Sequence, residues 1–105
     1  MAKPTVFTGN HPKFEDLEFT PVPLMEGVQA RIKFPNGWGA SVVKHRGSYG
    51  GLEGLYELAV LDDEGNLSYD TPITSDVEGW LQPFKVSYLL QKIHALLPGP
   101  GYKRK

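Results

Sequence analysis

A strict alternation of apolar and polar residues over residues 28–34 constrains this chain more than any other feature of its sequence. The apolar positions are Val28, Ala30, Ile32 and Phe34, and the polar positions are Gln29, Arg31 and Lys33. Because successive side chains of a strand point to opposite faces of its sheet, this alternation predicts a strand with one buried face. The Asn-Gly pair at 36–37 then favours a tight hairpin turn, so residues 38–44 are expected to return as a second strand.

Two further strands are expected beyond a glycine-rich connection. Residues 55–61 (LYELAVL) are almost continuously apolar, with Glu57 as the exception, which is typical of a central strand buried on both faces. Residues 62–66 (DDEGN) are rich in turn formers, and residues 67–70 are expected to pair back as a fourth strand. These segments together predict a four-stranded antiparallel meander.

The last third of the chain carries a helical pattern. Apolar residues recur there at spacings of three and four, at Val86, Leu89, Leu90, Ile93, Leu96 and Leu97. This spacing places them on one stripe, which must be buried against the sheet. Pro83 suits the first turn of the helix, and Pro-Gly-Pro-Gly at 98–101 ends it. Residues 74–80 are expected to form only a brief helical turn before it.

The predicted architecture is one α+β domain over residues 27–98, in which the C-terminal helix packs the meander sheet. A chain of 105 residues is too short for two ordinary cores. Residues 1–26 hold four prolines and no sustained period, so an extended N-terminal arm is expected, with a short turn at 14–17. Residues 99–105 are expected to form a solvated basic tail.

Composition excludes several classes of protein. The sequence has no cysteine, which excludes disulfides, thiolate nucleophiles and Cys-ligated zinc. The N-terminus lacks the apolar core of a secretory signal, and no apolar run approaches the roughly 18 residues of a membrane helix. The protein is therefore expected to work in the cytoplasm, without membrane contact.

Charge is distributed unevenly along the chain, although the formal net charge is only −1. Residues 27–46 carry four Lys or Arg and no acid, whereas residues 47–84 carry eight acids and no Lys or Arg. Two interpretations stay open: these segments lie side by side and neutralise each other, or they form two oppositely charged surfaces. The small net charge argues against a protein that generally coats nucleic acid.

The glycine-rich stretch 46–54 (RGSYGGLEG) is the first candidate for a functional element. Four glycines in nine residues are too many for a helix or strand interior, so a mobile loop is expected. Its glycine amides, beside His45 and Arg46, could face a phosphate, but the motifs of a P-loop and of a dinucleotide fold are both absent. A plain connection is the first interpretation, a partner-binding loop the second and a phosphate site the third.

A basic face with an aromatic residue is the second candidate. Its expected members across the first hairpin are Arg31, Lys33, Lys44, His45, Arg46 and Tyr49. Phosphate contacts supply most non-specific affinity for nucleic acids, so four Lys or Arg predict weak and salt-sensitive binding. A solvated or internally paired face is the simpler interpretation.

Familiar catalytic and metal-binding patterns are missing from the sequence. The three histidines lie far apart without a second ligand at metal spacing, and DDEGN lacks the ligand positions of an EF-hand. No nucleophile elbow or zinc-protease helix motif is present. The protein is therefore expected not to be an enzyme and to need no cofactor or metal. A deep pocket lined by His45, Glu57 and Asp70 would revive an enzyme hypothesis.

Four segments in the middle of the chain carry a resemblance. They are Gly-Ala-Ser-Val-Val at 39–43, Ser-Tyr-Gly-Gly at 48–51, Leu-Tyr-Glu-Leu-Ala-Val at 55–60, and Tyr-Asp-Thr-Pro-Ile-Thr at 69–74 before an Asp-Val-x-Gly turn. Together they resemble a type of small protein of unknown function encoded by tailed bacteriophages and prophages. This resemblance brings no activity or catalytic residue. It implies a viral protein in the host bacterial cytoplasm, where small domains often bind host or phage proteins.

The resulting hypothesis is a non-enzymatic phage accessory protein that binds a host or phage protein, or a second copy of itself. The candidate partner-binding residues are Arg31, Lys33, Trp38, Lys44, His45, Arg46, Tyr49, Gly50 and Gly51. Trp38 and Trp80 are expected in or at the edge of the core, but either of them would be the leading interface anchor if it is exposed. The hypothesis itself predicts an exposed Tyr49 or Trp38. The alternative is a small nucleic-acid-binding module that uses the basic hairpin face.

Overall fold

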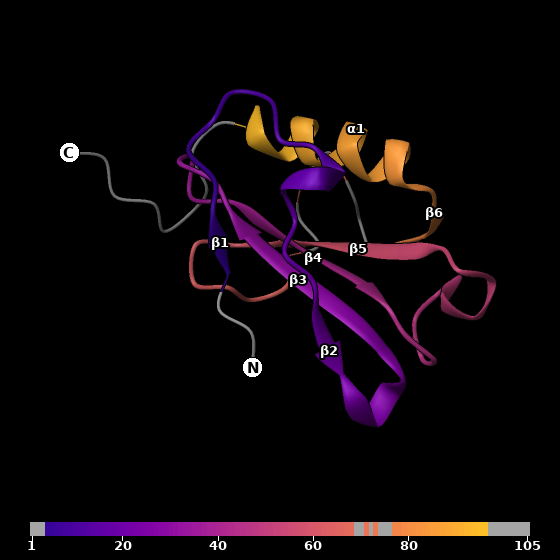
Figure 1. The fold of residues 1–105 in the computed structure, drawn as a ribbon. Helices are drawn as coiled ribbons and strands as arrows, with labels where there is room; N and C mark the ends of the chain where they lie inside the picture. Colours follow the sequence, from indigo (N-terminus) through magenta and orange to yellow (C-terminus); the bar gives the residue numbers. More distant parts are fainter. Residues whose placement is uncertain (1–3, 69–70, 72, 74–76, 97–105) are drawn as a thin grey trace.

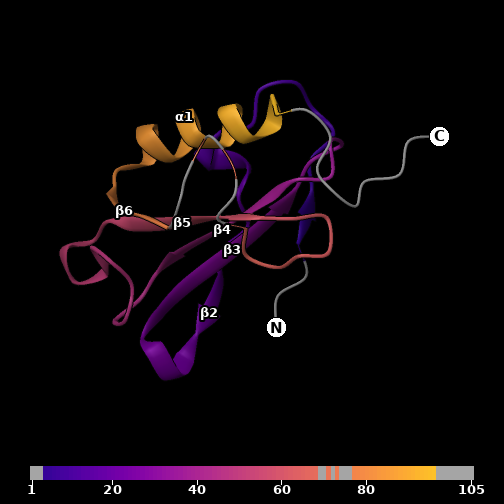
Figure 2. The same ribbon diagram turned by 180° about the vertical axis from the view of Figure 1, so that it is seen from behind.

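The computed structural model describes residues 4–68, 71, 73 and 77–96, which form a mixed sheet with one helix on one of its faces (Figures 1 and 2). The strands are β1 Thr5–Val6, β2 Thr20–Val22, β3 Gly27–Lys33, β4 Gly39–Lys44, β5 Tyr56–Leu61 and β6 Glu78–Leu81. The 3-10 turns are η1 Phe14–Asp16, η2 Pro23–Met25 and η3 Gly51–Glu53, and the helix is α1 Pro83–His94. Among these elements no helix is long and apolar enough to cross a membrane.

β3 and β4 form the predicted hairpin. They pair antiparallel with Ala30 opposite Val42, and Gly37 between them has a φ of 92°, which glycine adopts without a Cβ clash. Ala30, Ile32 and Val42 are completely buried on the face that meets the helix. The predicted strands, turn and apolar face are therefore confirmed.

The C-terminal helix is also confirmed. α1 begins at Pro83, whose missing amide hydrogen costs nothing in the first turn. Its buried residues are Val86, Leu89, Leu90 and Ile93, and they share one core with Ile32, Val42, Leu58 and Val60 of the sheet. Leu96 packs half-buried against this core, and Leu97 lies outside the described residues.

The sheet differs from the predicted four-stranded antiparallel meander. Its strand order is β1-β3-β4-β5-β6, and β2 also pairs with β3. β1 runs parallel to β3, whereas β2 pairs antiparallel with the first residues of β3. No strand was predicted in residues 1–26, because proline lacks the amide donor that strand pairing uses. Strands of only two and three residues at a sheet edge need few such donors and therefore tolerate proline. The residues expected to form an extended arm therefore add two strands to the sheet.

The fourth strand of the meander is misplaced in the prediction. Within the described residues, the segment expected at 67–70 makes only one bridge, from Leu67 to Leu61. The strand that pairs with the other edge of β5 is β6, where a helical turn over 74–80 was expected. A helix N-cap contributes about 1 kcal/mol, which favoured the predicted turn. Burial of the Leu81 side chain in the core contributes about 1.5–3 kcal/mol and favours the strand. Residues 69–70 and 74–76 lie outside the described residues.

Part of the N-terminal segment belongs to the core. Leu17 is buried, and the ring centroids of Phe14 and Phe19 lie 5.0 and 5.6 Å from that of Tyr56 in β5. The amide of Phe14 also donates a hydrogen bond of 2.8 Å to Oγ of Ser87 in α1. The predicted short turn at 14–17 is thus present as η1 and is held against both sheet and helix.

Candidate functional site

The glycine-rich stretch between β4 and β5 folds into a hydrogen-bonded loop. Oγ of buried Ser48 accepts the amide of His45 and donates to its carbonyl, both at 2.9 Å. The carbonyl of Gly50 accepts the amides of Glu53 and Leu55 at 3.0 and 2.9 Å. Its glycines serve defined turns, because Gly50 has a φ of 90°. The stretch connects β4 to β5, as expected, and it has a defined set of hydrogen bonds of its own.

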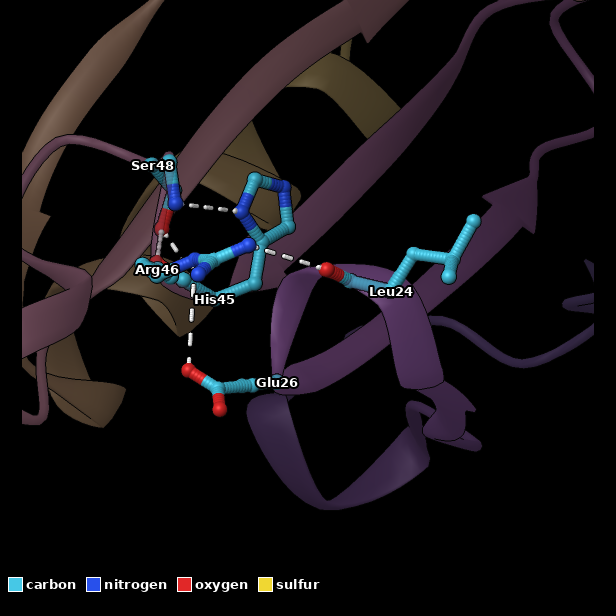
Figure 3. A network of polar contacts seen from close by, with 6 residues as sticks. Leu24, Glu26, His45, Arg46 and Ser48 are labelled. Atoms are coloured by element: carbon cyan, nitrogen blue, oxygen red, sulfur yellow. Dashed lines mark hydrogen bonds and ion pairs between the residues drawn. The ribbon is translucent and has the colours of Figure 1, made fainter.

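Figure 3 shows the base of this loop, where it meets η2. Nη2 of Arg46 donates to the carbonyl of Leu24 at 3.1 Å, and Nε lies 3.9 Å from Oε1 of Glu26. The amide of Gly47 donates to Nδ1 of His45 at 3.1 Å. The Arg46 contacts connect the loop to η2. The Gly47 amide and Nδ1 of His45 bond to each other and are not turned towards a phosphate.

Tyr49, in the middle of the loop, stacks on Trp80 of β6. The ring centroids lie 5.4 Å apart with an angle of 25° between the ring planes. The amide of Trp80 donates to the carbonyl of Tyr49 at 3.2 Å, and the amide of Tyr49 donates to Oε1 of Glu57 at 2.8 Å. The two side chains are 56% and 59% exposed, so they present an aromatic pair to solvent.

The backbone under the aromatic pair is strained and closely packed. Trp80 has a φ of 54°, a left-handed conformation that costs a bulky residue on the order of 1–3 kcal/mol. The register shift between Tyr56 and Leu58 marks a β-bulge in which Gly79 and Trp80 lie opposite Glu57. A Cβ on Gly79 would overlap the Cβ of Tyr49. The bulge and the glycine together let the Trp80 ring turn outward onto Tyr49.

Other exposed apolar side chains lie at the same end of the molecule. η3, β6 and the first turn of α1 gather there in both views of the fold (Figures 1 and 2). η3 carries exposed Leu52, and the first turn of α1 carries exposed Phe84. The elements that carry these exposed apolar side chains therefore lie at the same end of the molecule as the aromatic pair.

The sequence prediction placed Tyr49 and Trp38 among the site residues and left out Trp80, which it named as an interface anchor only if exposed. It grouped both tryptophans with the core, whereas Trp38 is 7% exposed and Trp80 is 59% exposed. The available signal was Gly79, because an isolated glycine next to apolar strand residues often marks a bulge. Two other predicted residues shape the loop: a Cβ on Gly50 would lie 2.9 Å from Cα of Trp80, and one on Gly51 would overlap the carbonyl of His45.

The predicted basic residues do not share one face of the sheet. Arg31 and Lys33 point away from α1, because they alternate with buried Ile32. Lys44 pairs with Val28 and has its Nζ 5.1 Å from the ring centroid of Tyr56, on the helix side. The prediction of one basic face across the hairpin is wrong. Lys44 lies two residues after buried Val42 and therefore points to the same face as Val42. Ser41 lies opposite Arg31, and both point to the other face.

The acidic turn after β5 lies over Arg31. Nη2 of Arg31 donates to the carbonyl of Gly65 at 3.3 Å, and its Nε is buried without a hydrogen-bond partner among the described residues. A hollow of about 260 Å³ beside it has a lining of both charge signs, made by Pro4, Arg31, Lys33, Gly39, Leu61, Asp62, Asp63, Glu64 and Gly65. The acidic and basic segments therefore meet here, as the first interpretation of the charge pattern expects.

Metal-ligating side chains do not gather in the part of the chain that the structure describes. No three His, Cys, Asp or Glu side chains gather there at metal-binding distance. The hollow beside Arg31 includes neither His45 nor Glu57, and Asp70 lies outside the described residues. Comparison of the chain with protein-family models, with curated proteins and with solved structures finds no match.

Proposed function

We propose that this protein is a non-enzymatic module that binds another protein through the aromatic pair Tyr49–Trp80. The supporting observation is that two large rings are stacked and exposed on a strained bulge. Aromatic side chains held in one position are frequent anchors of protein interfaces, since little side-chain entropy is lost when they bind. The left-handed conformation of Trp80 costs free energy in the unbound protein. Strained residues of this kind cluster at functional sites, and partner binding is a function that would explain this one.

The surroundings of the aromatic pair favour a protein over a nucleic acid. Glu57 contacts Tyr49, Glu78 precedes Trp80 in β6, and Glu53 lies in η3 of the same loop. These carboxylates repel phosphate groups. The cations that the nucleic-acid alternative requires are divided between the two faces of the hairpin.

The resemblance of the four segments named above to tailed-phage proteins supplies a biological setting for this proposal. In that setting the protein is a phage accessory protein that acts on a host or phage protein in the bacterial cytoplasm. Two of the resembling segments, 48–51 and 55–60, contain Tyr49 and Glu57 and therefore contribute to the aromatic pair and its support.

Affinity capture from phage-infected cells tests the proposal. Trp80→Gly removes the ring while suiting the φ of 54°, and Tyr49→Ala removes the other ring. Val6→Ala is the matched control, because Val6 is an exposed apolar residue of β1 at the opposite end of the strand order. Thermal unfolding of each variant verifies that it is folded.

The expected result is a protein partner, identified by mass spectrometry and then purified, that binds the parent and Val6→Ala equally. Trp80→Gly and Tyr49→Ala should each bind it at least about tenfold more weakly, as truncation of an interface anchor does. Equal binding by all four proteins would contradict the role of the aromatic pair.

A further inference from the structure

We infer that the part of the partner bound by the aromatic pair is an extended segment that carries arginine. This inference rests on the proposed function and adds the chemistry of the ligand. Three features of the described surface support it: its charge, its open aromatic rings and its position at the edge of the sheet.

Three glutamates lie in the segments that hold the aromatic pair. Oε1 of Glu57 lies 2.8 Å from the backbone nitrogen of Tyr49, and Glu78 is exposed two residues before Trp80. Exposed Glu53 lies in η3, at the same end of the molecule. The stretch 47–84, which supplies the whole pair, has no Lys or Arg. The cations that flank this stretch, Arg46 and Lys85, lie against Glu26 and over the ring of Tyr88. The glutamates beside the aromatic pair favour a partner that carries positive charge.

The rings of the pair can accept a cation. In the described part of the chain, the lysines placed over aromatic rings lie elsewhere: Lys44 over Tyr56, and Lys85 and Lys92 over Tyr88. A guanidinium stacks flat on an indole or phenol ring and can donate at the same time to a neighbouring carboxylate. Arginine therefore fits the combination of Trp80, Tyr49 and their glutamates better than lysine, whose ammonium is compact and strongly hydrated.

The position of the pair favours an extended ligand. β6 is the last strand in the order β1-β3-β4-β5-β6, and it is only four residues long. The Trp80 amide is already bonded to the carbonyl of Tyr49, so a partner segment would lie beside this terminal strand mainly through its side chains, which can reach the rings. The bulge at Gly79 and Trp80 limits regular pairing, which leaves the arginine contacts to supply much of the selectivity.

A peptide titration followed by nuclear magnetic resonance tests the inference on the full chain. The probe is a capped pentapeptide of alternating Ala and Arg, and the comparison peptides carry Lys or Glu in place of Arg. The indole N–H signal of Trp80 is assigned by its loss in Trp80→Phe, and that of buried Trp38 is the internal reference. We expect the Arg peptide to move the Trp80 signal alone, the Lys peptide to bind at least about threefold more weakly, and the Glu peptide not to bind.

Charge variants supply the second arm of the test. Glu57→Gln keeps an oxygen that can accept the Tyr49 amide while removing the negative charge, and it is combined with Glu78→Gln. This double variant should bind the Arg peptide at least about threefold more weakly, whereas Glu64→Gln, in the turn over Arg31, should bind as the parent does. Raising salt from about 50 to about 300 mM should weaken binding by the parent more than by the double variant.

Failure of this inference is distinguishable from failure of the proposed function. Suppose that binding of the captured partner requires Trp80, but the Arg peptide does not move the indole signal of Trp80 and the Glu57→Gln/Glu78→Gln variant still binds that partner fully. The proposed function then stands, and the ligand is not an arginine segment. Reversal of Lys103, Arg104 and Lys105 to Glu detects competition by the protein's own basic terminus. A gain of affinity of more than about tenfold on that reversal would assign the surface to the chain's own terminus and overturn the partner assignment.

Discussion

Asn36 joins the first hairpin to the end of the helix. Its Nδ2 donates to the carbonyls of Ile93, His94 and Leu96 at 2.9, 3.1 and 3.0 Å, and its Oδ1 accepts the amide of Trp38 at 3.0 Å. The last carbonyls of a helix lack partners within the helix, and this one side chain shares its two amide hydrogens among three carbonyls there, of which that of Ile93 also accepts the amide of Leu96 at 3.1 Å. A residue that suits a hairpin turn by its local conformation is thus also the cap of α1.

Removal of this cap should destabilise the protein. Asn36→Ala is expected to lower the free energy of unfolding by about 1–3 kcal/mol, because partly buried carbonyls lose this donor. Asn36→Asp should cost at least as much, since its carboxylate faces the negative end of the helix. Urea unfolding measures both changes, with exposed Asn10→Ala as the control. An Asn36→Ala protein as stable as the control would show that solvent caps the helix equally well.

At the scale of elements, the loop 45–55 and β6 pack closely against each other. The amide of Trp80 bonds to the loop at Tyr49, and a Cβ at either Gly50 or Gly79 would press on the other segment. Gly54, in contrast, has a φ of 79° and open space around its Cα. The glycines of these two segments therefore serve two different needs, close approach at Gly79 and backbone conformation at Gly54.

These two needs predict different effects of the same substitution. Gly79→Ala should lower the free energy of unfolding by about 2–3 kcal/mol, as overpacking does, and should separate the rings of the aromatic pair. Gly54→Ala should cost about 1 kcal/mol, the ordinary penalty of a left-handed alanine, and leave partner binding unchanged. Chemical denaturation and the Trp80 indole signal check both. Equal costs for the two variants would contradict the close packing of loop and bulge.

At the scale of the whole molecule, residues 5–26 and the C-terminal helix close the same core. Leu17 is buried with residues of β3, β5 and α1, and the carbonyl of Pro12 accepts Nε2 of Gln91 at 3.2 Å. β1 and β2 pair with β3 near its two ends. The N-terminal segment therefore contributes to the stability of the domain rather than only lying beside it.

The N-terminal segment should unfold together with the rest of the domain. Leu17→Ala is expected to lower the global free energy of unfolding by about 2–4 kcal/mol, as large-to-small changes in a core do. Its exposed neighbour provides the control, because Glu18→Ala should change stability by less than about 0.5 kcal/mol. Calorimetry should record one transition for both variants. A separate early transition, or equal stability of the two, would show that this segment is not part of the core.

The sequence alone determined the elements whose signal is local. Alternation specified the β3–β4 hairpin, continuous apolar residues specified β5, and spacing of three and four specified α1, because each pattern follows from the geometry of one element. The loop with Tyr49 could also be located, since its glycines and flanking strands are adjacent in sequence. About half of the candidate site was therefore accessible without coordinates.

The tertiary structure alone decided the features that depend on distant partners. The short strands β1 and β2 exist because β3 offers them its free edge, and Lys44 points to the helix side because its strand parity follows that of Val42. Trp80 is exposed because a bulge opposite Glu57 turns it onto Tyr49, 31 positions earlier in the chain. Periodicity in the sequence shows which face of a single element is apolar. Pairing between distant segments decides which groups meet at the edge of the sheet, and it is this pairing that brings Trp80 onto Tyr49.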